Sequence, residues 1–409
     1  MPHYPDTGTG AESNGQRLAR LRARHRWTQA RLATETGYSV ETVKKFEQGR
    51  RSLDRPAVVL AFARALDCHP TEITGAPYVP IQADRDGQQA VAAVAAVRRA
   101  LLRHGRPARA TEQEAATVDV PQLRVRVAEA NQHRQAAALT KSGAALPALL
   151  RDLQVAAELT EGDQRREVFG LLASAYECAM QYLYKLGHSS DATLATERVL
   201  WASRETGDPL RVLAASWYDA GEFLTIGEHD EAGAIIDEAL TELGAIRSPA
   251  PEAVSLRGAF HLKASLNLAR ATDTKSAVHH LKKAEEAAEE LGEDRNDWQM
   301  QFGPTNTALW AVSLPVEMGN GKDAVARAEK VRLPAGYSRE RHSHFHIDRG
   351  RAHFYNGQRE QAVAAFLDAE RLAPQATRAH AGVRETVGTM IRTQKRGELV
   401  ELGIRLGVV

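Results

Sequence analysis

Residues 28–49 have the sequence TQARLATETGYSVETVKKFEQG, and this stretch decides the fold of the N-terminal part of the chain. Thr28 and Ser39 are residue types that cap the start of a helix, because their side-chain oxygens accept hydrogen bonds from the N–H groups of the first turn. Gly37 lies between the two predicted helices, where its tolerance of positive φ permits a tight turn. Gly49 ends the second helix in the same way. The stretch therefore predicts two short helices joined by a glycine-centred turn.

Three further helices are predicted around this pair. An amphipathic helix over residues 16–25 precedes it, with leucines on one face and arginines on the other. Pro56 begins a helix over 56–66, since proline is favoured in the first turn of a helix. A short fifth helix follows near 70–73. Two short helices at a tight turn within such a set form the helix-turn-helix arrangement.

The spacing of these residues resembles a known family of regulators. The pattern T-Q-x-x-L-A-x-x-x-G-x-S-x-x-T-V-x-x-F-E-x-G over 28–49 is similar to the lambda-repressor-like, or Xre-type, family. Ala33 and Val43 match the small and core positions of that family, whereas Phe46 stands where the family usually has isoleucine or leucine. The resemblance implies a five-helix DNA-binding domain over residues 15–75.

The resemblance also implies which side chains meet the duplex. In this geometry, the first residues of the second helix of the pair lie in the major groove, where valine can contact a thymine methyl group, glutamate can accept from cytosine and lysine can donate to guanine. The expected base-reading residues are Val40, Glu41, Thr42 and Lys45. The expected phosphate contacts, which position the duplex without specifying its sequence, are Gln29, Ser39, Lys44, Arg50 and Arg51. The alternative is that these charges form only a solvated surface.

Positive charge is concentrated in the same part of the chain. The whole chain of 409 residues has a formal net charge of +1, whereas residues 15–75 contain 12 Lys/Arg against six Asp/Glu. A local basic excess of this kind is typical of a nucleic-acid-binding domain.

The remaining composition indicates a cytoplasmic protein with no membrane partner. The two cysteines, Cys68 and Cys178, have no spacing typical of a zinc site or a disulfide framework. No apolar run is long enough for a membrane span, and the N-terminus lacks the features of a signal peptide.

The C-terminal three quarters of the chain repeat a pattern. Five segments, 191–200, 231–240, 276–285, 323–332 and 361–370, are spaced by 40, 45, 47 and 38 residues. Each has alanine at its second position: Ala192, Ala232, Ala277, Ala324 and Ala362. A second small or β-branched residue follows seven positions later, from Val199 in the first segment to Val331 in the fourth and Ala369 in the last. Glycine stands five residues before the alanine in four segments, and Thr272 does so in the third. Alanine permits close helix packing and glycine ends the preceding helix, so a helix–turn–helix unit of this period predicts an α-solenoid.

These long, degenerate repeats resemble the tetratricopeptide repeat family, and further helix pairs are predicted over 121–158 and 375–409. The predicted fold is all-α: a five-helix lambda-repressor-like domain followed by a right-handed tetratricopeptide-like α-solenoid. The predicted parts are a disordered leader over 1–14, the helix-turn-helix domain over 15–75, a linker with one helix over 76–120, and a sensor and dimerisation domain over 121–409. The alternative is a generic helical bundle whose spacing is coincidental.

The inner helices of such an array line a concave groove, which could hold a peptide or small-molecule effector. The candidate groove residues are Trp217, Tyr218, His261, Asn267, Asn306, Trp310, Arg349 and Tyr355. Tyr176 and Tyr182 are further candidates. The alternative for each is packing between repeats.

No catalytic motif is present, and we expect no enzyme activity, cofactor or metal site. His342, His344 and His346 lack a third ligand at a metal-motif spacing, and GNGKDA over 319–324 departs from the phosphate-binding loop pattern. The pattern favours a transcriptional regulator similar to two-part regulators of actinobacteria, which binds a pseudo-palindromic operator as a homodimer. The alternative is a protein-interaction scaffold whose head is only an anchor.

Overall fold

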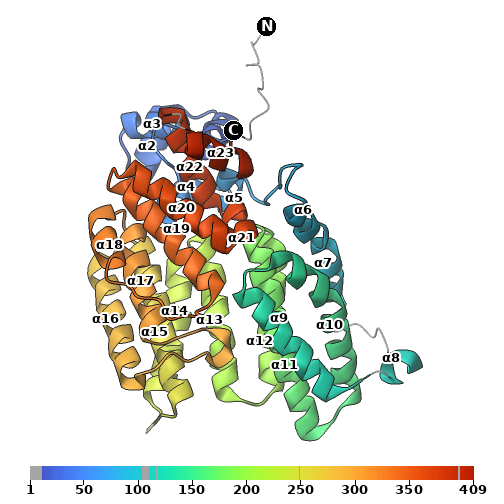
Figure 1. Ribbon diagram of the computed structural model, residues 1–409. Helices are drawn as coiled ribbons and strands as arrows, with labels where there is room; N and C mark the ends of the chain where they lie inside the picture. Colours follow the sequence, from blue (N-terminus) through green and yellow to red (C-terminus); the bar gives the residue numbers. More distant parts are fainter. Residues whose placement is uncertain (1–11, 104–109, 117, 248, 395–396) are drawn as a thin grey trace.

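The computed structural model describes residues 12–103, 110–116, 118–247, 249–394 and 397–409, and within these ranges every regular element is a helix. This confirms the predicted all-α fold class (Figure 1). The first five helices form the head, which we define as residues 12–75. They are α1 (Asn14–Arg24), α2 (Gln29–Thr36), α3 (Val40–Glu47), α4 (Pro56–Ala65) and α5 (Pro70–Thr74).

The rest of the chain forms a curved array in which the helices from α9 to α20 pack on their neighbours in sequence (Figure 1). Three short helices come first: α6 (Arg85–Ala92), α7 (Val94–Leu102) and α8 (Glu112–Ala116). The following helices are α9 (Val120–Gln135), α10 (Leu139–Leu159), α11 (Gly162–Lys185), α12 (Ser189–Glu205), α13 (Pro209–Ile226), α14 (His229–Gly244), α15 (Pro251–Arg270), α16 (Thr274–Leu291), the 3-10 helix η1 (Asp297–Gln299), α17 (Pro304–Glu317), α18 (Gly321–Ala328), α19 (Arg339–Tyr355), α20 (Arg359–Leu372), α21 (Pro374–Ala379), α22 (Ala381–Thr393) and α23 (Gly397–Arg405).

The five repeated segments lie in α12, α14, α16, α18 and α20, so the predicted repeat body is confirmed. Their shared alanines are all buried, at 0–1% exposure, where a larger side chain would separate the packed helices. The turn before each of these helices contains a residue with positive φ. These residues are Gly187, Gly227, Thr272, Gly319 and Gly357.

Three details differ from the sequence prediction. Helix α18 ends at Ala328, so Val331 lies beyond it, and Pro334 is incompatible with a continued helix. The segment 76–120 contains three helices instead of a linker with one, because its alanine-rich stretch packs closely on α10: the Ala93 side chain lies 2.9 Å from where a Cβ on Gly143 would be. The predicted leader, 1–14, lies mostly outside the described residues, but Asn14 is the first residue of α1 and is buried.

The head has an apolar core of its own, distinct from the cores of the array. The rings of Tyr38, Phe46 and Phe62 pack together at centroid distances of 5.4–6.1 Å. Phe46, which departs from the family pattern, is 2% exposed and makes an edge-on contact with Phe62. The larger ring therefore fills the head core without displacing α3.

None of the described helices is both long enough and apolar enough to cross a membrane.

Candidate nucleic-acid interface and central cavity

The two helices of the predicted pair begin and end where their capping residues require. The Thr28 hydroxyl accepts from the Arg31 N–H at 3.1 Å, and the Ser39 hydroxyl accepts from the Thr42 N–H at 3.1 Å. Gly37 ends α2 with φ 72°, a left-handed conformation that an L side chain rarely adopts. Local side-chain chemistry thus sets the position of α3 relative to α2.

Helix α3 has one face in the head core and one face in solvent. Val43 and Phe46 are buried in the core, whereas Val40, Glu41 and the two lysines at 44 and 45 are exposed. An apolar valine that is 46% exposed at the first turn of a helix is available to contact a ligand. The outer face of α3 therefore presents three of the four predicted base-reading side chains.

The fourth base-reading candidate and two of the phosphate candidates already have partners within the head. Thr42 is half-buried, and its hydroxyl lies 2.9 Å from the Ser39 hydroxyl. The Gln29 amide donates to Glu47 at 2.7 Å, and Glu47 is also paired with Arg22 at 2.6 Å. The structure thus places Gln29 and Ser39 in contacts that hold the helix pair together.

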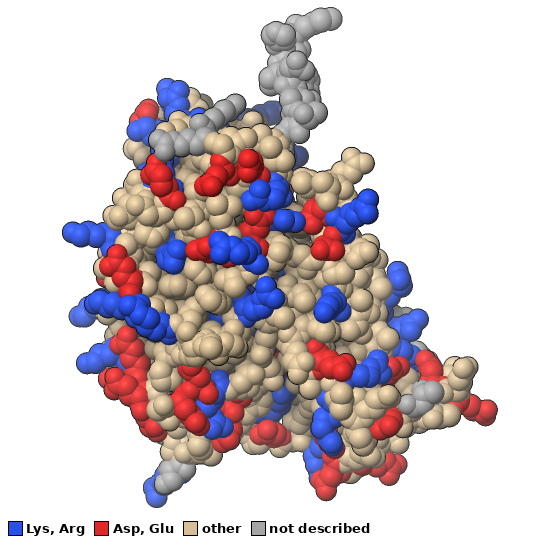
Figure 2. All heavy atoms as spheres, viewed as in Figure 1, with Lys and Arg blue, Asp and Glu red and all other residues tan. Residues whose placement is uncertain are grey.

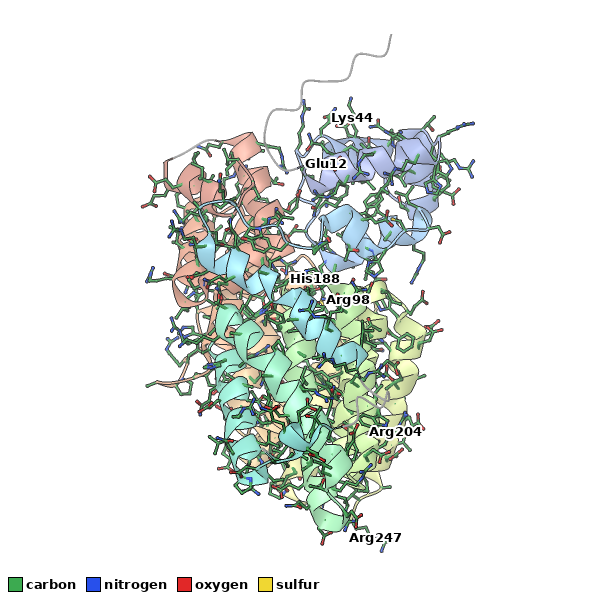
Figure 3. The ribbon with its side chains drawn as sticks, turned by 90° about the vertical axis from the view of Figure 1, so that its right-hand side faces the viewer. Glu12, Lys44, Arg98, His188, Arg204 and Arg247 are labelled. Carbon is green, nitrogen blue, oxygen red and sulfur yellow. The ribbon has the colours of Figure 1, made fainter. Side chains whose placement is uncertain are left out.

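The cationic phosphate candidates lie on the surface around α3. Lys44, Arg50 and Arg51 are exposed, and the Arg51 guanidinium lies 5.2 Å from the centroid of the Phe46 ring. Figure 3 shows Lys44 at the end of the molecule opposite Arg247, so this side chain points away from the array. On the face that Figure 2 shows, basic and acidic side chains are intermingled over the array.

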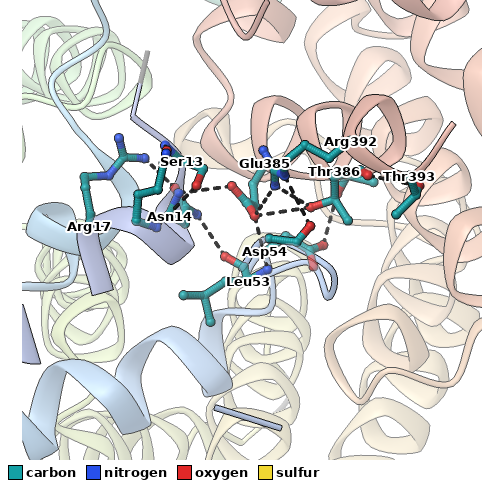
Figure 4. A network of polar contacts seen from close by, with 12 residues as sticks. Ser13, Asn14, Arg17, Leu53, Asp54, Glu385, Thr386, Arg392 and Thr393 are labelled. Carbon is teal, nitrogen blue, oxygen red and sulfur yellow. Dashed lines mark hydrogen bonds and ion pairs between the residues drawn. The ribbon is translucent and has the colours of Figure 1, made fainter. Parts of the chain in front are cut away.

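The head is attached to the C-terminal helices by buried polar contacts (Figure 4). The Glu385 carboxylate on α22 accepts from the backbone N–H groups of Asn14, at 3.2 Å, and Leu53, at 3.4 Å. Arg392, two turns further along α22, donates to the Glu385 carboxylate and to the Gly49 carbonyl, both at 3.2 Å. Burial raises the pKa of Glu385. One carboxylate therefore satisfies two head amides that the head itself leaves without a partner.

A second buried contact joins the loop before α4 to α19. The Asp54 carboxylate accepts from Arg351 Nε at 3.2 Å, and their side chains are 1% and 5% exposed. The hydroxyls of Tyr355 and Thr386 also donate to this carboxylate. Because both charged groups are buried, the loop cannot leave α19 without exposing or orphaning them. No sequence pattern singles out Asp54, Arg351, Glu385 or Arg392, since a single charged residue has no periodic signature.

A cavity of about 550 Å³ lies between the head and the array. The head contributes Asn14 and residues from 53–60 and 69–75 to its wall, and the array contributes residues from α11, α13, α15, α17, α19 and α22. The cavity is therefore bounded both by the part of the chain that carries α3 and by the repeats.

Three of the predicted groove residues line this cavity: Trp217, Tyr218 and Trp310. The other five make contacts elsewhere. His261 lies against His280, Asn267 contacts His229, Asn306 accepts from Arg341, Arg349 pairs with Asp368, and Tyr355 donates to Asp54. Tyr176 accepts from Gln154, and Tyr182 donates to the Ala90 carbonyl.

Comparison with known proteins identifies the head. Among solved structures, the chain is similar to PlcR of Bacillus thuringiensis in its complex with the peptide PapR7 and DNA, at 12% identity and a TM-score of 0.31, over 87% of this chain and 98% of that one. No curated protein matches the chain. The family described as helix-turn-helix domain matches residues 15–74, so this N-terminal part of the chain is a helix-turn-helix domain.

Proposed function

We propose that the protein is a sequence-specific DNA-binding transcriptional regulator with an Xre-type head. The observation that carries this proposal is the outer face of α3, which is exposed and contains Val40, Glu41 and Lys45. Lys44 of the same helix lies at the end of the molecule (Figure 3). In a helix-turn-helix domain this face enters the major groove, where these three side chains meet base edges.

The ion pair on this face permits base contact at little cost. Lys45 Nζ lies 3.7 Å from a Glu41 carboxylate oxygen, and both side chains are more than half exposed. A solvent-exposed pair of this kind contributes at most about 1 kcal/mol, so it separates readily when the duplex provides partners. Lys45 then donates to guanine and Glu41 accepts from cytosine.

Lys44, Arg50 and Arg51 contact phosphates and set the orientation of the head on the duplex. All three are exposed around α3, and flexible cations in such positions bind any sequence. Gln29 and Ser39 hold α2 and α3 in place through their contacts with Glu47 and Thr42, and their helix N-termini face the backbone of the duplex.

Two copies of the chain bind a pseudo-palindromic operator, because one head covers one half-site. The array, over 121–409, provides both the dimer contacts and the effector site. The buried pairs at Asp54 and Glu385 support transmission between the array and the head: a change in the curvature of the array moves α19 and α22, and with them the head. The distance between the two heads then determines whether both half-sites are occupied.

The test is selection of bound duplexes from a random library, followed by anisotropy titrations of variants. Lys45→Ala should relax specificity at one base pair, a loss of about 1–3 kcal/mol for the cognate duplex. Arg50→Ala should weaken cognate and scrambled duplexes equally and reduce the slope of log affinity against log salt by about 1.

Lys275→Ala, which removes an exposed lysine from α16, is the matched control and should change neither property. If Lys45→Ala leaves binding to cognate and scrambled duplexes unchanged, the proposed placement of α3 in the groove is wrong.

A further inference from the structure

The cavity between the head and the array is lined by a buried lysine that no described carboxylate neutralises. Lys263, on α15, is 6% exposed and lines the cavity. Its ammonium lies 3.4 Å from the centroid of the Trp217 ring, and among the residues that the structure describes it has no hydrogen-bond or ion-pair partner. Burial lowers the pKa of Lys263 to about 7. A buried ammonium without a carboxylate is costly, and an anionic ligand would remove that cost.

The acidic groups nearest to Lys263 have hydrogen-bond or ion-pair partners other than this lysine. Glu340 binds Lys185 at 2.7 Å, and Glu317 binds Arg270 at 3.0 Å. Glu222, the acid that acts most on Lys263, accepts instead from two threonine hydroxyls on α12. None of these carboxylates lies within ion-pair distance of Lys263. The Lys263 ammonium is therefore available to form an ion pair with an anionic ligand.

The charge of the wall limits the ligand to one negative charge. The wall has six Lys/Arg and five Asp/Glu side chains, so its formal balance is +1. A dianion such as a phosphate monoester would leave an uncompensated negative charge beside buried carboxylates, whereas a single carboxylate neutralises the cavity.

The apolar part of the wall determines the rest of the ligand. Trp310 on α17 and Tyr218 on α13 line the cavity, together with Leu309 and Phe345. One face of Trp217 is occupied by the Lys263 ammonium, while the Trp310 ring is only partly buried. Aromatic side chains in a cavity wall favour a flat apolar group, which packs on a ring in an offset or edge-on geometry. The volume is within the range of sites for small organic molecules.

We propose that this cavity binds a small aromatic carboxylic acid, with its carboxylate on Lys263 Nζ and its ring system against Trp310. Because the head forms part of the wall, the bound acid contacts the head as well as the repeats. This inference names the effector class of the proposed regulator and so rests on that function for its consequence, but the site itself can be tested without DNA.

The test compares an isosteric pair of probes, 2-naphthoate and the uncharged 2-naphthamide, by isothermal titration calorimetry with the full chain at pH 6.5. At this pH most of the Lys263 population is charged. Wild-type protein should bind 2-naphthoate at least tenfold more tightly than 2-naphthamide. Lys263→Met retains the apolar stem without the charge and should bind the two probes equally.

Two further variants complete the design. Lys263→Arg retains a cation and should keep a preference for the carboxylate. Lys283→Met removes a lysine on α16 that does not line the cavity and whose side chain is 42% exposed, and it should behave as wild type. The proposal is overturned if wild-type protein binds the two probes equally, if Lys263→Met keeps the preference, or if neither probe binds at millimolar concentration.

DNA binding is measured separately by anisotropy, with and without 2-naphthoate. A preference for the carboxylate that depends on Lys263, in a protein that binds no duplex, would support the cavity site and refute the proposed function. Duplex binding without this preference would support the proposed function and refute the cavity site.

Discussion

Asp54 provides the sharpest test of how the head is attached, because one substitution removes its charge and keeps its size. In Asp54→Asn, the carboxylate that accepts from Arg351 Nε at 3.2 Å and from the hydroxyls of Tyr355 and Thr386 becomes a neutral amide. The head core does not depend on this side chain, whose contacts are with α19 and α22. The substitution should therefore weaken docking of the head and leave the head folded.

The expected loss of docking free energy depends on the ion-pair partners that Arg351 keeps. Removing one partner of a buried ion pair costs about 3–5 kcal/mol when the remaining charge is left alone. Arg351 still has Glu317 at 3.4 Å and Asp348 at 3.7 Å. We therefore expect the smaller loss of about 2–3 kcal/mol, which lowers the docking equilibrium constant by about 30- to 150-fold.

Hydrogen exchange monitored by mass spectrometry measures this change directly. The N–H groups of Asn14 and Leu53 are bonded to Glu385 on α22, so both exchange when the head separates from the array. Peptides that contain these residues should lose protection by the factor expected for docking. The Val43 N–H, which is bonded to the Ser39 carbonyl inside the head, should not respond.

Asp163→Asn is the matched control, since the Asp163 side chain is 92% exposed on α11 and its removal should be neutral within about 0.5 kcal/mol. If Asp54→Asn changes protection at Asn14 and Leu53 by no more than this control does, the Asp54–Arg351 pair does not hold the head. Equal loss of protection at Val43 would mean that the head unfolds, which would also refute the reasoning.

Three other predictions concern single residues. Gly49→Ala should be more destabilising than Gly37→Ala in chemical unfolding, because both glycines have positive φ but only the added Cβ at Gly49 would lie 2.4 Å from Arg392 Nε; equal losses would contradict this. Ser39→Ala should cost about 1 kcal/mol of stability by removing the cap of α3, whereas Ser39→Asp, which keeps a capping oxygen, should be as stable as wild type. Because burial lowers the pKa of Lys263 to about 7, the unfolded chain holds more protons than the folded chain above that pH. The stability deficit of wild type relative to Lys263→Met should therefore shrink by about 2 kcal/mol between pH 7 and pH 9 in urea titrations, and a constant difference would refute it.

The local chemistry of the head could be predicted from the sequence because each feature depends on a few neighbouring residues. Thr28 and Ser39 cap α2 and α3 as expected, and Pro56 is the first residue of α4. A hydroxyl can cap a helix by accepting from the N–H three positions later, and this hydrogen bond does not depend on distant parts of the chain.

The repeat body was predictable for a related reason. A small residue such as Ala192 or Ala362 recurs wherever helices must pack closely, so the pattern survives although the repeats are degenerate. The end of α18 was not predicted, and neither was the presence of three helices within 76–120 instead of one, since both depend on how tightly particular segments pack on the array.

The sequence by itself determined the helices, their caps, the repeated unit and the basic head, because these follow from interactions between residues close together in the chain. Only the tertiary structure decided that the head lies against α19 and α22 and that Asp54 meets Arg351 across 297 residues. It also decided that Lys263 is buried with no counter-charge among the described residues. A charged side chain is stable in the interior only when a distant segment supplies its partner, or when a ligand does. The position of a charged residue in the sequence does not indicate which distant residue will be its partner.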